Sequence, residues 1–302
     1  MSEAGLNHEF GIPGAVRFEQ SPEGLLLARI SSDGGTADIC LQGAHVFSWN
    51  VKGLLEPVLW LSREAKFQAG KSLRGGIPVC WPWFGPHAEG GSFPAHGFAR
   101  TATWDVAASD VDGSGAVCLT LTLEPESMPE AMWPHATTLE LKVSLGATLK
   151  LELSTRNIGS QAFVLGEALH TYFNISDIGN VAVHGLHGVE YWDTVGTVEK
   201  KVQAGAIDFS AETDRVYIHS PQACSIDDPG FARRIHIHKQ GSLSTVVWNP
   251  WVAKAERMGD LGKPDGWRQM LCVESANAWD NKLTLAPGER HTLSVEYRVE
   301  PL

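Results

Sequence analysis

Alternation of apolar and polar residues constrains the fold of this chain more than any other feature of its sequence. Residues 138–145 read TLELKVSL and residues 148–155 read TLKLELST, with a Gly-Ala pair between them. A period of two places apolar side chains on one face of a strand, so the pattern predicts a hairpin with one buried and one solvated face. Similar alternation predicts further strands at residues 24–30, 36–41, 115–124 and 291–299.

Short clusters of turn-forming residues separate these stretches, at residues 31–35, 109–115 and 286–289. A helical period is visible at residues 252–262, where two glycines interrupt it. We find no internal repeat and no linker, and therefore expect a single domain spanning residues 1–302. Many strands and few short helices predict an all-β fold, a large antiparallel β-sandwich of two sheets packed face to face.

Composition and charge exclude several classes of protein. Hydrophobic residues make up 43% and charged residues 20%, which is enough for a sizeable core and excludes general disorder. The net charge of −11 argues against a nucleic acid partner, although a few cations in one cleft can still hold a small anion. No apolar run reaches the length of a membrane span, and the N-terminus MSEAGLNHEF does not resemble a signal peptide, so we expect a soluble, cytoplasmic protein with no membrane partner.

The five cysteines, Cys40, Cys80, Cys118, Cys224 and Cys272, are dispersed and include no CxxC pair. This spacing argues against a disulfide framework and against a structural zinc site.

The stretch with the strongest functional signal is residues 71–100, KSLRGGIPVCWPWFGPHAEGGSFPAHGFAR. Its many glycines and prolines exclude a regular helix or a central strand, and predict a long shaped loop. It carries three cations and two histidines among aromatic residues: Lys71, Arg74, Arg100, His87 and His96. Aromatic faces suit a sugar ring and arginine suits a phosphate, which predicts a binding loop. The alternative is a structural loop whose tryptophans fill a core and whose arginines pair with carboxylates.

Four later islands also place polar groups among aromatic or apolar residues. His170 lies in GEALHTYFNIS, Asp214 in ETDRVY and Glu274 in MLCVESAN, and the fourth island is VVWNPW at residues 246–251. The three titratable residues each have a plainer interpretation: His170 as a hydrogen-bonded structural histidine, Asp214 as a turn aspartate and Glu274 as a salt-bridged glutamate. The apolar residues before Glu274 favour burial, which raises the proton affinity of a carboxylate and suits a general base.

Two histidine pairs raise the question of a metal. His236 and His238 share one face of a strand, and a second pair lies at residues 184 and 187. No cysteine or carboxylate cluster with ligand spacing lies nearby, and residues 233, 234 and 239 are cationic. We therefore predict no metal there. The chain also lacks the GxGxxG, Walker, HExxH and GxSxG signatures, so we expect no cofactor.

Taken together, the islands resemble the hexose-6-phosphate mutarotases (glucose-6-phosphate 1-epimerases) of the aldose 1-epimerase superfamily. The resembling segments are SLRGGIPVCWPWFGPH, HGFAR, ALHTYF, TDRVY, VVWNPW and MLCVESAN, in family order over residues 72–277. The resemblance implies a galactose mutarotase-like sandwich with the sugar in a cleft on one concave sheet, and a monomer.

The resemblance also implies roles for individual residues. Glu274 would be the general base on the anomeric hydroxyl, His170 the general acid at the ring oxygen, and His96 would help to polarise the sugar. No cofactor or metal would take part.

The same resemblance implies how the ligand, a small sugar phosphate, would be held. Arg74 and Arg100 would bind the phosphate, and Asp214 a sugar hydroxyl. Ala95 departs from the family, which often has glutamine before this histidine, so one sugar contact is in question. The chemistry agrees with the residue types, because opening a hemiacetal needs a proton taken from O1 and one given to O5. Two alternatives stay open: a non-catalytic carbohydrate-binding or regulatory module, and an epimerase of unphosphorylated aldoses.

Overall fold

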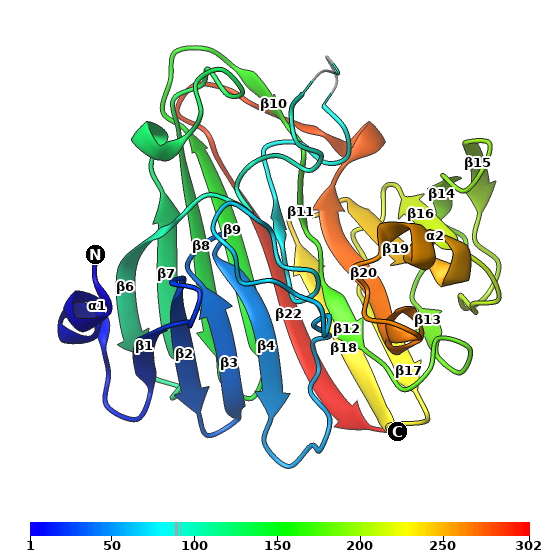
Figure 1. The fold of residues 1–302 in the computed structure, drawn as a ribbon. Helices are drawn as coiled ribbons and strands as arrows, with labels where there is room; N and C mark the ends of the chain where they lie inside the picture. The colour runs from blue at the N-terminus through cyan, green and yellow to red at the C-terminus, as the bar shows by residue number, and fades with distance from the viewer. Residues whose placement is uncertain (88–89, 91) are drawn as a thin grey trace.

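The computed structural model describes residues 1–87, 90 and 92–302, and is built almost entirely of antiparallel strands (Figure 1). In this described part of the chain the strands form three larger sheets and one small pair. We call the larger ones the back sheet, the front sheet and the N-terminal sheet.

The back sheet has eight strands, in spatial order β13 (Ala182–His184), β17 (Cys224–Asp228), β18 (Arg233–Gln240), β22 (Arg290–Pro301), β9 (Leu149–Asn157), β8 (Thr137–Leu145), β7 (Val117–Leu123) and β6 (Asp105–Val111). The front sheet contains β15 (Glu199–Val202), β14 (Glu190–Asp193), β16 (Thr213–Tyr217), β19 (Ser244–Asn249), β20 (Met270–Asn277), β11 (Glu167–Leu169) and β5 (Val79–Cys80), and β12 (Tyr172–Asn174) also pairs with β20.

The N-terminal sheet has the order β1 (Val16–Gln20), β2 (Leu26–Ser32), β3 (Gly35–Cys40) and β4 (His45–Val51), and β10 (Phe163–Leu165) pairs with β21 (Leu283–Leu285). The helical segments are α1 (Glu3–Phe10), α2 (Trp251–Met258), η1 (Pro125–Ser127), η2 (Gly266–Gln269) and η3 (Trp279–Asn281).

The N-terminal and front sheets both pack against the back sheet. Contacts of β2 with β7 and β8, and of β3 with β8, place the N-terminal sheet over one half of the back sheet. Contacts between β20 and β22 join the front sheet to it. The predicted all-β antiparallel sandwich is therefore confirmed.

The alternating stretches became strands as predicted. In β8 buried and partly exposed residues alternate along all its length, and β8 pairs with β9 from Leu145 opposite Leu149. The other predicted stretches correspond to β2, β3, β7 and β22. Two turn clusters are shorter than predicted, because β2 continues to Ser32 and β6 to Val111. Polar residues can extend a strand where their side chains reach solvent, since the ladder uses only backbone groups.

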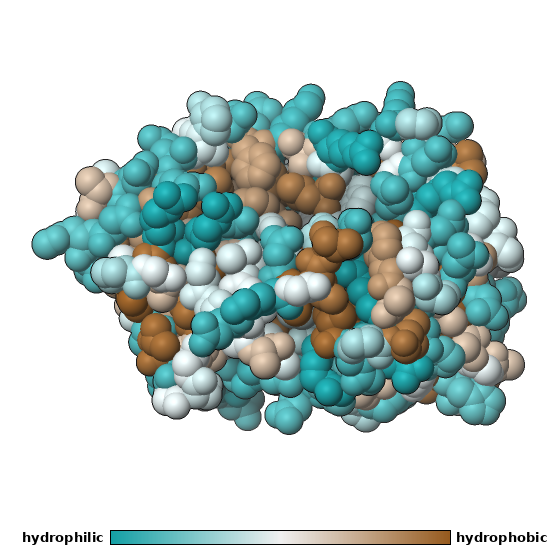
Figure 2. Space-filling model, turned by 90° about the horizontal axis from the view of Figure 1, so that it is seen from below, coloured by the Kyte–Doolittle hydropathy of each residue, from teal (hydrophilic) through white to brown (hydrophobic). Residues whose placement is uncertain are grey.

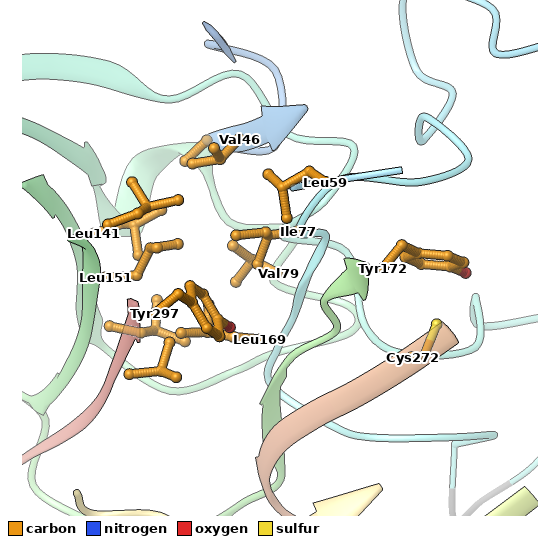
Figure 3. Packing of buried hydrophobic residues seen from close by; sticks show 14 of the residues in the cluster. Val46, Leu59, Ile77, Val79, Leu141, Leu151, Leu169, Tyr172, Cys272 and Tyr297 are labelled. Carbon is orange, nitrogen blue, oxygen red and sulfur yellow. The ribbon is translucent and has the colours of Figure 1, made fainter. Parts of the chain in front are cut away.

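The buried faces of the sheets meet in one large core (Figure 3). Leu141 and Leu151 of the back sheet face residues such as Val79 and Leu169 of the front sheet. A buried hydrogen bond of 2.5 Å joins the hydroxyls of Thr171 and Tyr297 within it. All five cysteines are buried and unpaired. The surface seen from below is mostly hydrophilic, with hydrophobic residues in separate groups (Figure 2).

Two helices differ in how well the sequence predicted them. The predicted helix at 252–262 is α2, which ends where Gly259 takes a left-handed conformation with φ of 70°. Helix α1 was not predicted, because it buries only Leu6 and so lacks an apolar stripe. Among the described residues, no helix is long and apolar enough to cross a membrane.

Residues 71–100 form the long loop that their composition predicts, interrupted by the two-residue strand β5. This strand is at the edge of the front sheet, the position that prolines tolerate. Residues 88, 89 and 91 of the stretch lie outside the described residues.

Candidate active site

The six predicted site residues meet at one cavity of about 490 Å³ above the middle of the front sheet. They are Arg74, His96, Arg100, His170, Asp214 and Glu274. The strand register explains why segments so distant in sequence meet. Asp214 of β16 lies opposite Trp248 of β19. On β20, Cys272 lies opposite Trp248 on one side and opposite Tyr172 of β12 on the other.

A larger cavity of about 710 Å³ lies beside Trp60 and Pro264. No histidine lines it among the described residues, so the smaller cavity is the better candidate for acid–base chemistry.

His170 and Glu274 form a buried acid–base pair in the cavity. His170 Nε2 lies 3.3 Å from Glu274 Oε1, and the Glu274 side chain is only 1% exposed. Burial, with the charge of Asp214, raises the pKa of Glu274 well above its usual value. Burial, followed by His96 and the two arginines, lowers the pKa of His170 well below its usual value. Both shifts favour the uncharged forms, a protonated carboxyl and a neutral imidazole.

Aromatic rings fix the plane of the His170 imidazole. It stacks on the Tyr172 ring, with centroids 4.8 Å apart and planes 10° apart. Trp248 packs edge-on at 6.2 Å. His170 Nδ1 and Glu274 Oε2 are buried without a hydrogen-bond partner in the described part of the chain. The pair is thus held by packing, with polar atoms left over for a ligand.

His96 is held in a single tautomer by the loop that carries it. Its Nδ1 accepts a hydrogen bond of 3.3 Å from the backbone N–H of Gly85. Burial, and then the charges of Arg100 and Arg74, lower its pKa to about 4. A neutral imidazole whose Nδ1 accepts must carry its hydrogen on Nε2, so His96 can donate a hydrogen bond from that atom.

The glycine after His96 is required by the geometry of this loop. Gly97 has φ of 73°, and a Cβ there would lie 1.8 Å from the carbonyl oxygen of Trp81. His96 itself has a positive φ of 64°. Such strain in a non-glycine residue is typical of functional sites.

The two arginines lie at the cavity with different partners. Arg74 donates to Asp260 Oδ2 from Nε at 3.0 Å, and to the Tyr172 hydroxyl from Nη1 at 3.0 Å. Arg100 Nη2 donates to the backbone oxygen of Ala95 at 2.7 Å.

Two further residues of the predicted binding loop, His87 and Lys71, do not line the cavity. The His87 ring packs edge-on against Trp83 and Phe93, at 4.6 and 4.9 Å, which makes it part of the loop's aromatic cluster. Lys71 is exposed, and its carbonyl oxygen accepts from Gln42.

Asp214 is paired with a lysine that sequence reasoning missed. Lys254 Nζ of α2 lies 3.3 Å from Asp214 Oδ2 and 2.9 Å from Glu212 Oε1. Burial raises the pKa of Asp214, although Lys254 opposes that shift. Lys254 and Met258 are four residues apart on α2 and both line the cavity, a helical spacing the sequence contained but did not link to the site.

One group of side chains could hold a metal ion. Among the described residues, His170, Cys272 and Glu274 offer ligand atoms within 4.8 Å of one another. The alternation of β20 places Cys272 and Glu274 on one face, a signal in the sequence that was not used. His236, of the histidine pair considered in the sequence, lies on the back sheet, where its Nε2 is 2.7 Å from Glu300 Oε1.

The chain as a whole is similar to known proteins. The sequence matches the family model "Aldose 1-epimerase" over residues 27–298. A Salmonella typhimurium protein named "Putative glucose-6-phosphate 1-epimerase" is 42% identical over 80% of both chains. A protein of the same name from Cenchrus ciliaris is 38% identical over 84% of this chain and 78% of its own.

Solved structures agree with the sequence relatives. A Salmonella typhimurium structure described as a "putative mutarotase" superposes with a TM-score of 0.88 and 35% identity, covering 96% of this chain and 95% of its own. A galactose mutarotase-like protein from Clostridium acetobutylicum shares the fold, with a TM-score of 0.76 and 16% identity over 95% of this chain and 98% of its own.

Proposed function

Because this chain belongs to the aldose 1-epimerase family, we propose that it interconverts the α and β anomers of a hexose 6-phosphate, with glucose 6-phosphate as the first candidate. The observation that carries the proposal is the His170–Glu274 pair, 3.3 Å apart, in a cavity that also contains Arg74 and Arg100.

In the proposed reaction Glu274 takes the proton of the anomeric hydroxyl while His170 gives a proton to the ring oxygen. The C1–O5 bond breaks, and O1 becomes the oxygen of an aldehyde. Rotation about C1–C2 presents the other face of the aldehyde. Glu274 then returns its proton to O1, O5 attacks C1, and His170 recovers its proton. Each assisted proton transfer contributes about 10²–10⁴-fold to the rate.

The pKa directions of the pair fit this cycle. Ring opening needs an ionised Glu274 and a protonated His170, whereas ring closure needs the reverse arrangement. Burial favours the protonated carboxyl and the neutral imidazole, which is the arrangement suited to the open-chain aldehyde. One proton moving within the pair converts one arrangement into the other.

His96 and Asp214 are proposed to hold the sugar, and the arginines its phosphate. The Nε2–H of His96 can donate to a sugar oxygen, and Asp214 can accept from a hydroxyl while Lys254 balances its charge. Arg74 and Arg100 carry permanent charges, which suit a phosphate dianion better than a neutral ring.

An epimerase of unphosphorylated aldoses is the second candidate, because Arg74 already has a carboxylate partner in Asp260. Replacing Arg74 or Arg100 by alanine separates the two candidates. If the two arginines hold a desolvated phosphate, each replacement should weaken the binding of glucose 6-phosphate by about 2–5 kcal/mol and leave the binding of glucose nearly unaffected. A small and equal effect on both sugars would favour the unphosphorylated substrate.

The direct test follows the equilibration of α- and β-glucose 6-phosphate by polarimetry or exchange NMR. Glu274→Gln keeps the shape of the side chain and removes its basicity, so it should slow the catalysed rate about 10²–10⁴-fold. Equal acceleration by the variant and the parent would show that Glu274 is not the base. Calorimetric binding of the sugar phosphate without any acceleration by the parent would favour a non-catalytic binding module.

A further inference from the structure

Arg74 is fixed in place by two groups on different sides of its guanidinium. Nε and Nη2 lie 3.0 and 2.9 Å from Oδ2 of Asp260, and Nη1 donates to the Tyr172 hydroxyl at 3.0 Å. A guanidinium is planar and carries five N–H groups. Nε and Nη1 each donate one of these hydrogen bonds, and Nη2 is in ion-pair contact with the same carboxylate oxygen, so the guanidinium keeps N–H groups that can donate to a ligand.

Asp260 itself is outside the cavity lining, whereas Arg74 and Tyr172 are part of it. Its main chain is also tied to the strand-like segment that carries Arg74. Ser62 Oγ donates to the backbone oxygen of Asp260 at 2.7 Å, and Ser62 N–H donates to the backbone oxygen of Arg74 at 2.9 Å. The Asp260 carboxylate therefore contacts Arg74 from outside the cavity lining, and its backbone is joined through Ser62 to the segment that carries Arg74.

We propose that Asp260 is a positioning residue, which fixes Arg74 so that its remaining N–H groups bind the anionic group of the substrate. This inference rests on the proposed function, and deepens it by giving the two arginines different tasks. The charge of Arg74 is balanced by Asp260, so Arg74 supplies direction. Arg100 donates to a backbone carbonyl oxygen, so its positive charge is not balanced by that partner and supplies attraction.

The consequence is that Asp260 affects recognition of the phosphate and does not affect the acid–base step. Two substitutions separate the geometry of Asp260 from its charge. Asp260→Ala removes the acceptor and the charge, whereas Asp260→Asn keeps an acceptor of the same shape. Asp177→Ala is a matched control, because Asp177 holds Arg268 through the same two nitrogens at the surface, outside the cavity lining.

The experiment measures kcat and KM for glucose 6-phosphate and for glucose in each variant. Loss of a charge-assisted contact should raise KM for glucose 6-phosphate about tenfold in Asp260→Ala, with kcat nearly unchanged. Asp260→Asn should raise KM for glucose 6-phosphate less than Asp260→Ala does, and Asp177→Ala should leave this KM unchanged. Turnover of glucose should stay within about twofold of the parent in all three variants. A purely structural role would not produce this difference, because both sugars would lose activity together.

Two results would overturn the inference: an equal loss on both sugars, or a lower KM for glucose 6-phosphate in Asp260→Ala. The second would mean that Asp260 competes with the substrate's anion. If the parent does not turn over glucose 6-phosphate, the proposed function fails separately, and Asp260 is tested by calorimetric titration with inorganic phosphate. Weaker phosphate binding in Asp260→Ala than in Asp260→Asn would support the positioning role, and unchanged binding in both would refute it.

Discussion

Replacing Glu274 by glutamine should stabilise the folded protein at neutral pH while it removes the proposed base. The Glu274 side chain is 1% exposed, and its Oε2 has no hydrogen-bond partner among the described residues. Burial raises its pKa well above the usual value, because the charged form is poorly solvated. Glutamine has nearly the same shape and no charge to bury, so the variant avoids this cost.

The size of the effect depends on pH with a definite sign. An unfolded chain ionises glutamate near pH ~4.3, whereas the folded protein keeps this proton to a higher pH. Above pH ~4.3 the contribution of Glu274 to the free energy of unfolding falls by about 1.4 kcal/mol per pH unit, until the pKa of Glu274 in the folded protein is reached. The lowered pKa of His170 gives the opposite slope below pH ~6.5. In the parent the two slopes therefore have opposite signs, and the difference between Glu274→Gln and the parent isolates the slope that Glu274 contributes.

The assay is urea denaturation of the parent and Glu274→Gln at several pH values, which gives the free energy of unfolding of each. The difference, variant minus parent, should be close to zero at the acidic end and should grow with pH. Glu23→Gln, at an exposed glutamate, is the control for replacing a carboxyl by an amide without burial. A pH-independent difference for Glu274→Gln would refute the assignment of Glu274 as a buried carboxyl that keeps its proton.

Three further predictions concern the fold that supports the site. Gly97→Ala should abolish activity, because the added Cβ would collide with the backbone of Trp81 and distort the site. Gly85→Ala is the control, because Gly85 also has a positive φ of 76° but has open space around it. It should lower the free energy of unfolding, measured by urea denaturation, by only about 1 kcal/mol. Leu141→Ala in the core should cost about 2–5 kcal/mol in the same assay. Burial acts to lower the pKa of His291, but Glu167 at 3.1 Å raises it overall. His291→Asn should therefore lose most stability below pH ~6.5 and progressively less as the pH rises through the folded pKa, in denaturation curves at matched pH values.

The fold was predictable where the side-chain pattern alone determines it. The hairpin of β8 and β9 follows from strict alternation and a short turn, and both strands appear with the expected buried face. The order of strands in the sheets was not predictable, because it depends on contacts between segments far apart in sequence. Helix α1 was missed because it packs through a single leucine.

The site was predictable to the extent that its residues stand in distinctive segments. All six predicted side chains line one cavity, and their roles there are proposals that await the experiments above. Lys254 and Asp260 were missed because nothing in α2 or the loop after it distinguishes them from surface charges. Only in the folded chain does Lys254 reach Asp214, 40 residues away in sequence, and Asp260 reach Arg74, 186 residues away.

Strand β20, which carries Glu274, is buried along its whole length and paired on both sides, whereas Arg74, His96 and Arg100 come from irregular segments. Amide protons of β20 should accordingly be among the last to exchange with solvent, and those of the arginine-bearing segments among the earlier ones. Under the proposed function, substitutions in these irregular segments would change which charged group on the sugar is recognised and would leave in place the strand that carries the proposed base.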